Sequence, residues 1–338
     1  MGSAPQTVPA PDAWSRRLRP YARPRLRRSL GEVAITVVPF VLLWALAAWT
    51  VTHGHWWGLL FTVPAAGFLL RLFVLQHDCG HGALFASRRV NDWTGRVLGV
   101  LTFTPYDYWR RSHAMHHAGA GNLDRRGIGD ITTLTVAEYR ALPPGGRLRY
   151  RLYRHPAVMF GLGPAWVFLC QYRVPMGLMR SGATPWVSTV ATTFAILVPA
   201  ALLCWAMGVG PFLAVQLPTT LMAATAGVWL FYVQHQFDGT HWTVGDEWRF
   251  AEAALEGSSN YVLPAPLRWI TGNIGVHHVH HLAARIPFYR LPEVLADHPD
   301  LAGMSRVTVG DSLAAVKLTL WDEGARRLVS FREAAVPA

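Results

Sequence analysis

Four stretches of the chain are apolar for long enough to cross a lipid bilayer as helices. A helix rises about 1.5 Å per residue, so the hydrocarbon core of a bilayer takes roughly 20 apolar residues. The stretches that meet this length are residues 33–52, 57–76, 187–207 and 211–233. Short connections join the first to the second and the third to the fourth, so the pattern predicts two tight transmembrane hairpins.

The placement of arginine predicts which side of the membrane each connection faces. Seven arginines precede the first span, from Arg16 to Arg28, and five follow the second span, from Arg88 to Arg111. The short connections inside the two hairpins carry neither Lys nor Arg. Because positively charged loops stay in the cytoplasm, we expect a multi-pass protein of the cell inner membrane with both termini and the active site on the cytoplasmic side.

Composition agrees with a membrane protein and narrows its partners. Of the 338 residues, 51% are hydrophobic and only 15% are charged, which is unlike a soluble globule. The net charge of +11 comes from arginines beside the apolar stretches, so we expect attraction to the headgroups of a lipid bilayer and no binding of nucleic acid. The three cysteines lack the paired spacing of a thiolate zinc site or a disulfide framework.

The same pattern predicts the domain organisation. We expect residues 1–30 to form a disordered, basic cytoplasmic tail, residues 31–295 the membrane domain, and residues 296–338 a cytoplasmic C-terminal segment. The apolar runs Val97–Pro105 and Ala157–Cys170 are too short to span, so they are either interfacial or re-entrant helices or ordinary buried helices. The predicted fold is an all-α integral membrane protein: four transmembrane helices in two hairpins, with a cytoplasmic helical cap.

Nine of the 15 histidines fall into three tight groups on the predicted cytoplasmic side. The groups are His77 and His81; His113, His116 and His117; and His277, His278, His280 and His281. Residues three or four apart share one face of a helix, so each group directs its imidazoles one way. His278 alone should point elsewhere, which leaves eight candidate ligands.

These imidazoles predict a site for two transition-metal ions. Eight are too many for one tetrahedral zinc, whereas imidazole suits iron and copper as well as zinc. The fourth span carries a ninth candidate, His235, out of the membrane, and His241 is the alternative to it. Ligating imidazoles usually donate their second N–H to an acceptor. The nearby acids and amide that could accept it, or else only cap helices and turns, are Asp78, Asp130, Asp238 and Asn273.

In order and spacing, the three groups resemble the H-x3-H, H-x2-HH and H-x2-HH boxes of the integral-membrane fatty-acid desaturase family. The resemblance covers residues 31–295 and points to bacterial acyl-lipid desaturases of the Δ12/ω-6-like branch. The further segments that carry it are residues 77–82, 103–106, 108–111, 232–236 and 285–292. It implies His77, His81, His113, His116, His117, His277, His280 and His281 as ligands, with His235 as the additional one. A second histidine at position 278 departs from the family pattern and leaves open which member of that pair ligates.

The resemblance also implies an activity. The protein would use two iron ions, with dioxygen as co-substrate, to introduce a cis double bond into the fatty acyl chain of a membrane lipid or an acyl thioester. No fused haem domain is recognised, so we expect a separate electron donor such as ferredoxin with its reductase. Tyr106, Trp109 and Trp229 are expected to line an apolar tunnel for the chain, or else to belong to the interfacial aromatic belt.

Two other functions remain open. The same superfamily contains hydroxylases and ketolases that act on lipids or carotenoids. A non-enzymatic membrane metal-binding protein or transporter would need ionisable residues within its spans. The predicted spans contain only Arg71, which disfavours that class.

Overall fold

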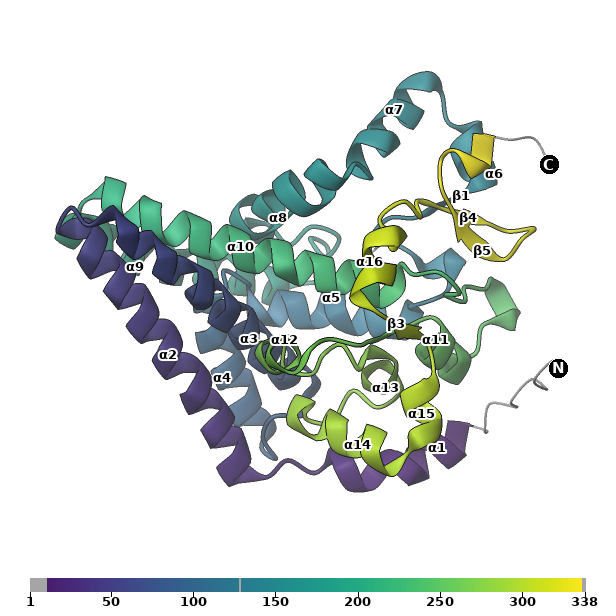
Figure 1. Ribbon diagram of the computed structural model, residues 1–338, viewed down its shortest axis with the longest axis horizontal. Coiled ribbons are helices and arrows are strands. Elements are labelled where there is room, and N and C mark those ends of the chain that lie inside the picture. The colour runs from purple at the N-terminus through teal and green to yellow at the C-terminus, as the bar shows by residue number, and fades with distance from the viewer. Residues whose placement is uncertain (1–10, 128, 336–338) are drawn as a thin grey trace.

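The computed structural model describes residues 11–127 and 129–335 (Figure 1). Within these residues four helices are long and apolar enough to cross a membrane, which confirms the four predicted spans. They are α2 (Leu26–Thr52), α3 (Thr62–His81, continuing the 3-10 helix Trp56–Phe61), α9 (Ala183–Met207) and α10 (Val209–His235). The fold is mainly helical, as predicted.

All four helices extend beyond the predicted spans, α2 and α3 by the most residues at one end. Helix α2 begins at Leu26 instead of residue 33, and α3 continues to His81 past residue 76. A span predicted from hydropathy ends where the polar side chains begin, whereas the backbone hydrogen bonds of the helix continue through these polar residues. The extension of α3 is what carries the first histidine group on the same rigid helix as the span.

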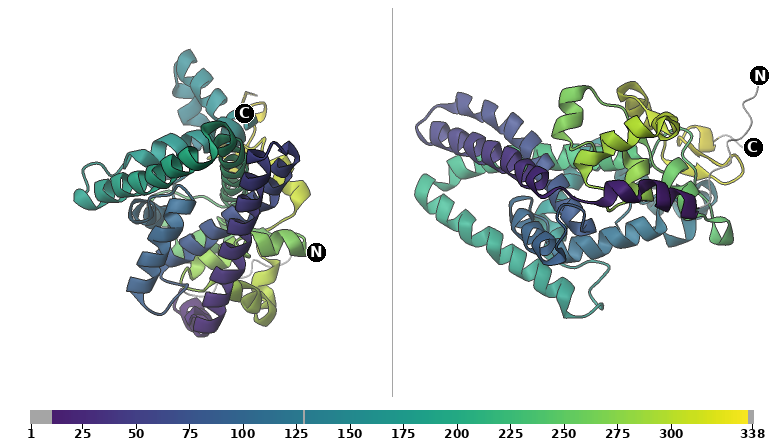
Figure 2. Two further views of the ribbon diagram at one scale, coloured as in Figure 1. Left: turned by 90° about the vertical axis from the view of Figure 1, so that its left-hand side faces the viewer. Right: turned by 90° about the horizontal axis from the view of Figure 1, so that it is seen from below.

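The two hairpins meet at one end of the molecule, on the left of Figure 1, and the histidine-bearing part lies at the other end. Gly58 lets the first hairpin close, because a Cβ there would lie 1.7 Å from the hydroxyl of Thr50. Helix α9 diverges from α10 (Figure 2, right) and leaves apolar side chains such as Phe194 and Trp205 exposed. An apolar surface of this extent fits a lipid environment.

Shorter helices and two small sheets form the cap. The helices are α1 (Pro11–Leu18), α4 (Arg88–Leu101), α5 (Tyr106–Gly119), α6 (Val136–Ala141), α7 (Pro144–Tyr153), α8 (Gly163–Ala165), α11 (Phe250–Glu256), α12 (Ala265–Ile270), α13 (His277–Leu282), α14 (Leu291–Asp297), α15 (Pro299–Gly303) and α16 (Val309–Ala315). In one sheet β1 (Leu134–Thr135) pairs in parallel with β4 (Leu320–Asp322), which pairs antiparallel with β5 (Arg327–Val329). In the other, β2 (Asn260–Tyr261) pairs in parallel with β3 (Arg306–Val307). Strands this short carry no readable alternation of apolar and polar residues, so the sequence did not predict them.

The two short apolar runs are neither spans nor fully buried helices. Helix α4 buries Leu98 and exposes Trp93 and Val97. The π-helical turns around α8 pack one face on α10 and expose Leu162 and Trp166. One packed face and one exposed apolar face favour the interfacial interpretation over the buried one.

The N-terminal region differs from the expected disordered tail. Residues 1–10 lie outside the described part of the chain, but residues 11–30 are mostly helical, with Trp14 and Leu18 buried. Arg17 also forms an ion pair with Asp300 at 3.1 Å. The main core likewise continues past residue 295 and includes Leu301.

Candidate metal centre

Four helices bring nine imidazoles together at the end of the hairpins that lies away from the hairpin turns. Helix α3 contributes two, α5 three, the last residue of α10 one, and α13 three. Among the described residues they form two groups in which all candidate ligand atoms lie within 4.8 Å of one another. The first group is His77, His81, His113, His117 and His280, and the second is His116, His235, His277 and His281.

Helices α5 and α13 each contribute to both groups: α5 gives two histidines to the first group and one to the second, and α13 gives one and two. In α5, His113 and His117 belong to the first group and His116 to the second. In α13, His280 belongs to the first group and His277 and His281 to the second. Successive residues of a helix are rotated by about 100°, so adjacent histidines point in different directions while residues four apart point the same way.

The spacing of the ring nitrogens is that of ligands around an ion. Two nitrogens bound at about 2.1 Å to one ion, at right to tetrahedral angles, lie about 3.0–3.4 Å apart. The Nε2–Nε2 distances are 3.0 Å for His81 and His113, 3.1 Å for His113 and His117, 3.2 Å for His117 and His280, 3.1 Å for His116 and His235, and 3.1 Å for His235 and His277. Both groups therefore already have the dimensions of a nitrogen ligand shell.

The protonation state of these rings also suits metal binding. Burial, reinforced by neighbouring histidines, holds the pKa well below its usual value for His113, His117, His277, His280 and His281. Neutral rings present lone pairs, and lone pairs directed at one point repel each other unless a cation lies there. The residues present therefore fit two imidazole-bound metal ions.

Two of the four expected acceptors lie beside the imidazoles. The Nδ1 of His116 bonds to the carboxylate of Asp130. Asp78 lies with a carboxylate oxygen 3.5 Å from Nδ1 of His77, and its other oxygen accepts a hydrogen bond from the backbone N–H of Phe288 at 2.7 Å. Asp78 thereby ties the loop after α13 to α3.

The other two expected acceptors lie elsewhere. Asp238 is exposed, and the Asn273 amide donates to the carbonyl of Phe288 at 3.3 Å. Neither contacts any of the nine grouped imidazoles within the described residues. Asp238 follows the end of α10, where the chain turns away from the centre.

The structure distinguishes between the alternative histidines. His235 lies in the second group, and its Nδ1 is 3.2 Å from the carbonyl of Gly257, to which it donates. His278 instead donates from Nε2 to the carbonyl of Leu301 at 2.9 Å, and His241 lies in neither group. His278 thus links α13 to α15 and points away from the centre, as its helical position predicts.

Of the three expected tunnel residues, Trp109 lies next to the imidazoles. Its ring stacks on His113 with centroids 4.6 Å apart. Gly80 makes room for it, because a Cβ at that position would lie 2.9 Å from the indole. Tyr106 instead donates to the carbonyl of Cys79 at 2.9 Å, and Trp229 packs on the helical turn before α8. Neither shows a ring contact to the grouped imidazoles in the described part of the chain.

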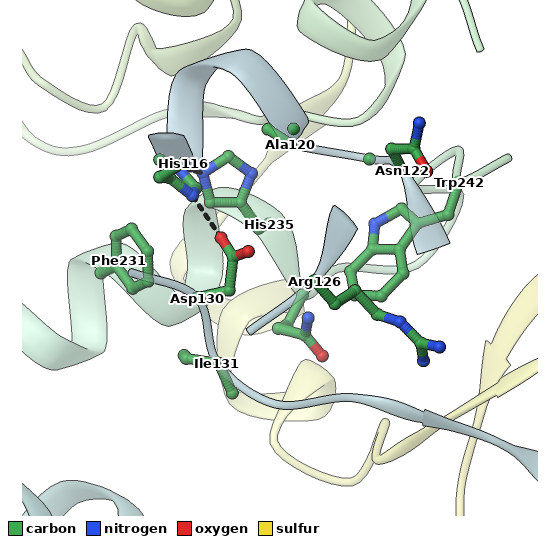
Figure 3. A pocket seen from close by; sticks show the side chains of 12 residues that line it. His116, Ala120, Asn122, Arg126, Asp130, Ile131, Phe231, His235 and Trp242 are labelled. Atoms are coloured by element: carbon green, nitrogen blue, oxygen red, sulfur yellow. Dashed lines mark hydrogen bonds and ion pairs between the residues drawn. The ribbon is translucent and has the colours of Figure 1, made fainter. Parts of the chain in front are cut away.

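A pocket opens onto the second group (Figure 3). Figure 3 shows Asp130 directed at His116, with His235 beside His116 and with Arg126 and Trp242 on the opposite wall. Phe231 also lines it, with its ring centroid 5.1 Å from that of His116. Sequence reasoning missed Phe231, although its position four residues before His235 places both on one face of α10.

The sequence also did not reveal an ion pair between the first two spans. Arg71 of α3 lies 2.5 Å from Glu32 of α2, and both side chains are about 1–2% exposed. Arg71 also donates to the carbonyl of Trp269 in α12. Charged residues at membrane depth need a partner, so Arg71 alone could have prompted a search for one.

Comparisons with known proteins agree with this geometry. The sequence model named Fatty acid desaturase matches residues 54–312. A fatty acid desaturase of Bacillus subtilis is 44% identical over 313 residues, which cover 92% of this chain and 88% of that protein. An sn-1 acyl-lipid omega-3 desaturase (ferredoxin) of Synechocystis sp. is 28% identical, with 79% and 74% covered, and an sn-1 oleoyl-lipid 12-desaturase of Synechocystis sp. is 28% identical, with 78% and 70% covered.

An acyl-lipid omega-3 desaturase (cytochrome b5) of Arabidopsis thaliana is also 28% identical, with 78% and 69% covered. The sequence-model match at residues 54–312 includes the membrane helices α3, α9 and α10 and all three histidine groups, that is, the parts of the chain that build the candidate metal centre. This chain is therefore an integral membrane protein that belongs to the fatty acid desaturase family of oxidoreductases.

Proposed function

We propose that this protein is an oxygen-dependent acyl-lipid desaturase with one iron ion in each imidazole group. The observation that carries the proposal is the pair of adjacent groups, five and four imidazoles, built on the ends of two membrane helices, α3 and α10, and on two cap helices, α5 and α13. The proposed ligands are His77, His81, His113, His117 and His280 for one ion and His116, His235, His277 and His281 for the other. Iron bound there would supply, with dioxygen and two electrons, the oxidising power to take two hydrogens from adjacent methylenes of an acyl chain.

The surrounding residues would hold this centre and keep it dry. Asp130 and the carbonyl of Gly257 accept hydrogen bonds from the outward nitrogens of His116 and His235, which fixes the tautomer and the orientation of each ring. Trp109 covers His113 and gives the first group an apolar wall. An apolar wall beside the metals suits an acyl chain better than a polar substrate.

The names of the relatives support the proposed partners. Two of the Synechocystis proteins are named for acyl-lipid or oleoyl-lipid substrates, so we propose the acyl chain of a membrane lipid as the substrate. Relatives are named with ferredoxin or cytochrome b5, and we propose a separate ferredoxin-like donor with its reductase. The arginine distribution supports an inner-membrane location with the active site and both termini in the cytoplasm.

The test is expression in a host that lacks polyunsaturated lipids, together with ferredoxin and its reductase. Fatty-acid methyl esters would be profiled by mass spectrometry and iron counted per purified chain. We expect a new olefin and two irons per chain, both lost in His116→Ala/His117→Ala, which removes one ligand from each group. His278→Ala is the matched control and should keep both. An oxygenated lipid or pigment without an olefin would assign the protein to the hydroxylases or ketolases, and an iron-loaded, reduced protein without product would refute the proposal.

A further inference from the structure

The segment from α6 to the end of α10 contains arginines but almost no acidic residues. From Tyr139 to Phe237 the sequence contains no Asp or Glu. Its last two arginines, Arg173 and Arg180, lie in the loop region that leads into α9. A third arginine reaches the same loop, because Arg111 of α5 donates to the carbonyl of Ser181 at 3.2 Å. None of these three arginines forms an ion pair with a described residue.

Arg173 is the most enclosed of the three. Its Nη2 donates to the carbonyls of Phe103 at 2.5 Å and Phe168 at 3.4 Å. Its Nε is buried and has no hydrogen-bond partner among the described residues. Burial lowers the pKa of this guanidinium, since no carboxylate offsets the loss of water. A half-buried cation with free donors is costly to keep, so an anion from outside the chain would complete it.

A run of aromatic contacts leads from Arg173 to the first imidazole group. It begins at Tyr172, the neighbour of Arg173, and ends at His113. The successive centroid distances are 5.3 Å for Tyr172 and Phe168, 6.2 Å for Phe168 and Phe73, 5.4 Å for Phe73 and Trp109, and 4.6 Å for Trp109 and His113. These rings form a continuous series of aromatic contacts between the unpaired cation and the candidate metal ligands.

The surroundings of Arg173 suit a lipid headgroup. Exposed apolar side chains flank it on both sides, Trp166 before it and Met179 and Trp186 after it. The transmembrane helix α9 begins ten residues further on, at Ala183. Arginine and tryptophan at the end of a span mark the headgroup layer of a bilayer.

We propose that Arg173, supported by Arg111 and Arg180, binds the phosphate of the glycerophospholipid whose acyl chain is desaturated. The acyl chain then lies along Phe168, Phe73 and Trp109 and reaches the first imidazole group. The guanidinium donors suit phosphate oxygens, which accept several charge-assisted hydrogen bonds at once. This inference rests on the proposed function, because it names the substrate of the same centre.

The binding test uses native mass spectrometry of the full-length protein in detergent. Dioleoyl phosphatidylglycerol competes with dioleoylglycerol, which has the same chains but no phosphate. We expect the wild type to prefer the phospholipid and Arg173→Gln to lose about ten-fold of that preference, with unchanged metal content. Arg173→Lys should retain part of it. The control Arg149→Gln, an exposed arginine of α7, should behave as wild type. An unchanged preference in Arg173→Gln would overturn the proposal.

A second experiment on the wild type distinguishes substrate from surrounding lipid, and it does not depend on the folding of a variant. Phosphatidylglycerol with a diazirine in mid-chain should cross-link to residues around Phe168, Phe73 or Trp109. Cross-links confined to the outer surfaces of α9 and α10 would show surrounding lipid only and overturn the proposal. Equal olefin formation with unchanged KM in Arg173→Gln would do so as well, with the desaturase function intact. Absence of any olefin in the wild type would instead refute the proposed function.

Discussion

Breaking the buried ion pair between Arg71 and Glu32 should destabilise the protein by an amount that depends on which of the two residues is replaced. Breaking a buried ion pair from one side costs about 3–5 kcal/mol. In Arg71→Met, Glu32 keeps a second partner, Arg28, at 2.7 Å, so we expect about 3 kcal/mol. In Glu32→Met, Arg71 keeps no anionic partner among the described residues, but only the neutral acceptors Thr36 and Trp269 and the faces of the Trp269 and Phe288 rings, so we expect about 5 kcal/mol.

The double variant Glu32→Met/Arg71→Met tests the reasoning directly. Apolar replacement of both partners is often nearly neutral, so we expect a loss of no more than about 2 kcal/mol against the 8 kcal/mol or so of the summed single changes. The assay is the free energy of unfolding in mixed micelles of SDS and dodecyl maltoside, followed by circular dichroism. Arg28→Gln is the control, because Arg28 is 59% exposed and Glu32 keeps its buried partner Arg71 in this variant, so we expect a smaller loss than in Arg71→Met. If the loss of stability in the double variant equals the sum of the losses in the two single variants, the buried-pair argument is refuted.

Three further predictions concern the metal centre. His280→Ala should lower the metal content by at least one ion per chain by elemental analysis, whereas His278→Ala should keep both ions and lose only about 1–3 kcal/mol of stability; equal metal loss would contradict the assignment of His278. Asp130→Asn should weaken metal affinity about 10–100-fold in a chelator competition, and an unchanged affinity would show that its bond to the imidazole does not matter. Gly80→Ala should displace the ring of Trp109 and cost about 1–3 kcal/mol, measured by thermal unfolding; a melting curve like that of the wild type would contradict the close fit.

The spans were predictable because length and hydropathy determine them, but their ends were not. The polar first turns of α2 are stabilised by helix hydrogen bonds and by the ion pair between Glu32 and Arg71 of α3. A predicted span that begins at residue 33 includes neither these turns nor Glu32, so the ion pair could not be seen from hydropathy. The ordered helix α1 was missed for a related reason, since its buried Trp14 packs on distant parts of the chain.

The histidine pattern predicted shared helix faces but not the division into two groups. Which group His116 joins depends on how α5 is oriented against α10 and α13, and this is tertiary information. The acids show the same limit. Asp238 is only three residues from His235 yet is exposed, whereas Asp130, fourteen residues from His116, folds back onto it. Proximity along the chain was a poor guide to contact.

The exchange of ligands between α5 and α13 has a consequence for how the centre fills. Because each of these helices supplies both groups, an ion in one group fixes the rotation of both helices and thereby positions the remaining ligands of the other. Binding of the first ion includes the entropic cost of ordering the two shared helices, and the second ion then binds to ligands that are already ordered. Metal binding should therefore be positively cooperative, with chains that hold either two ions or none and few that hold one.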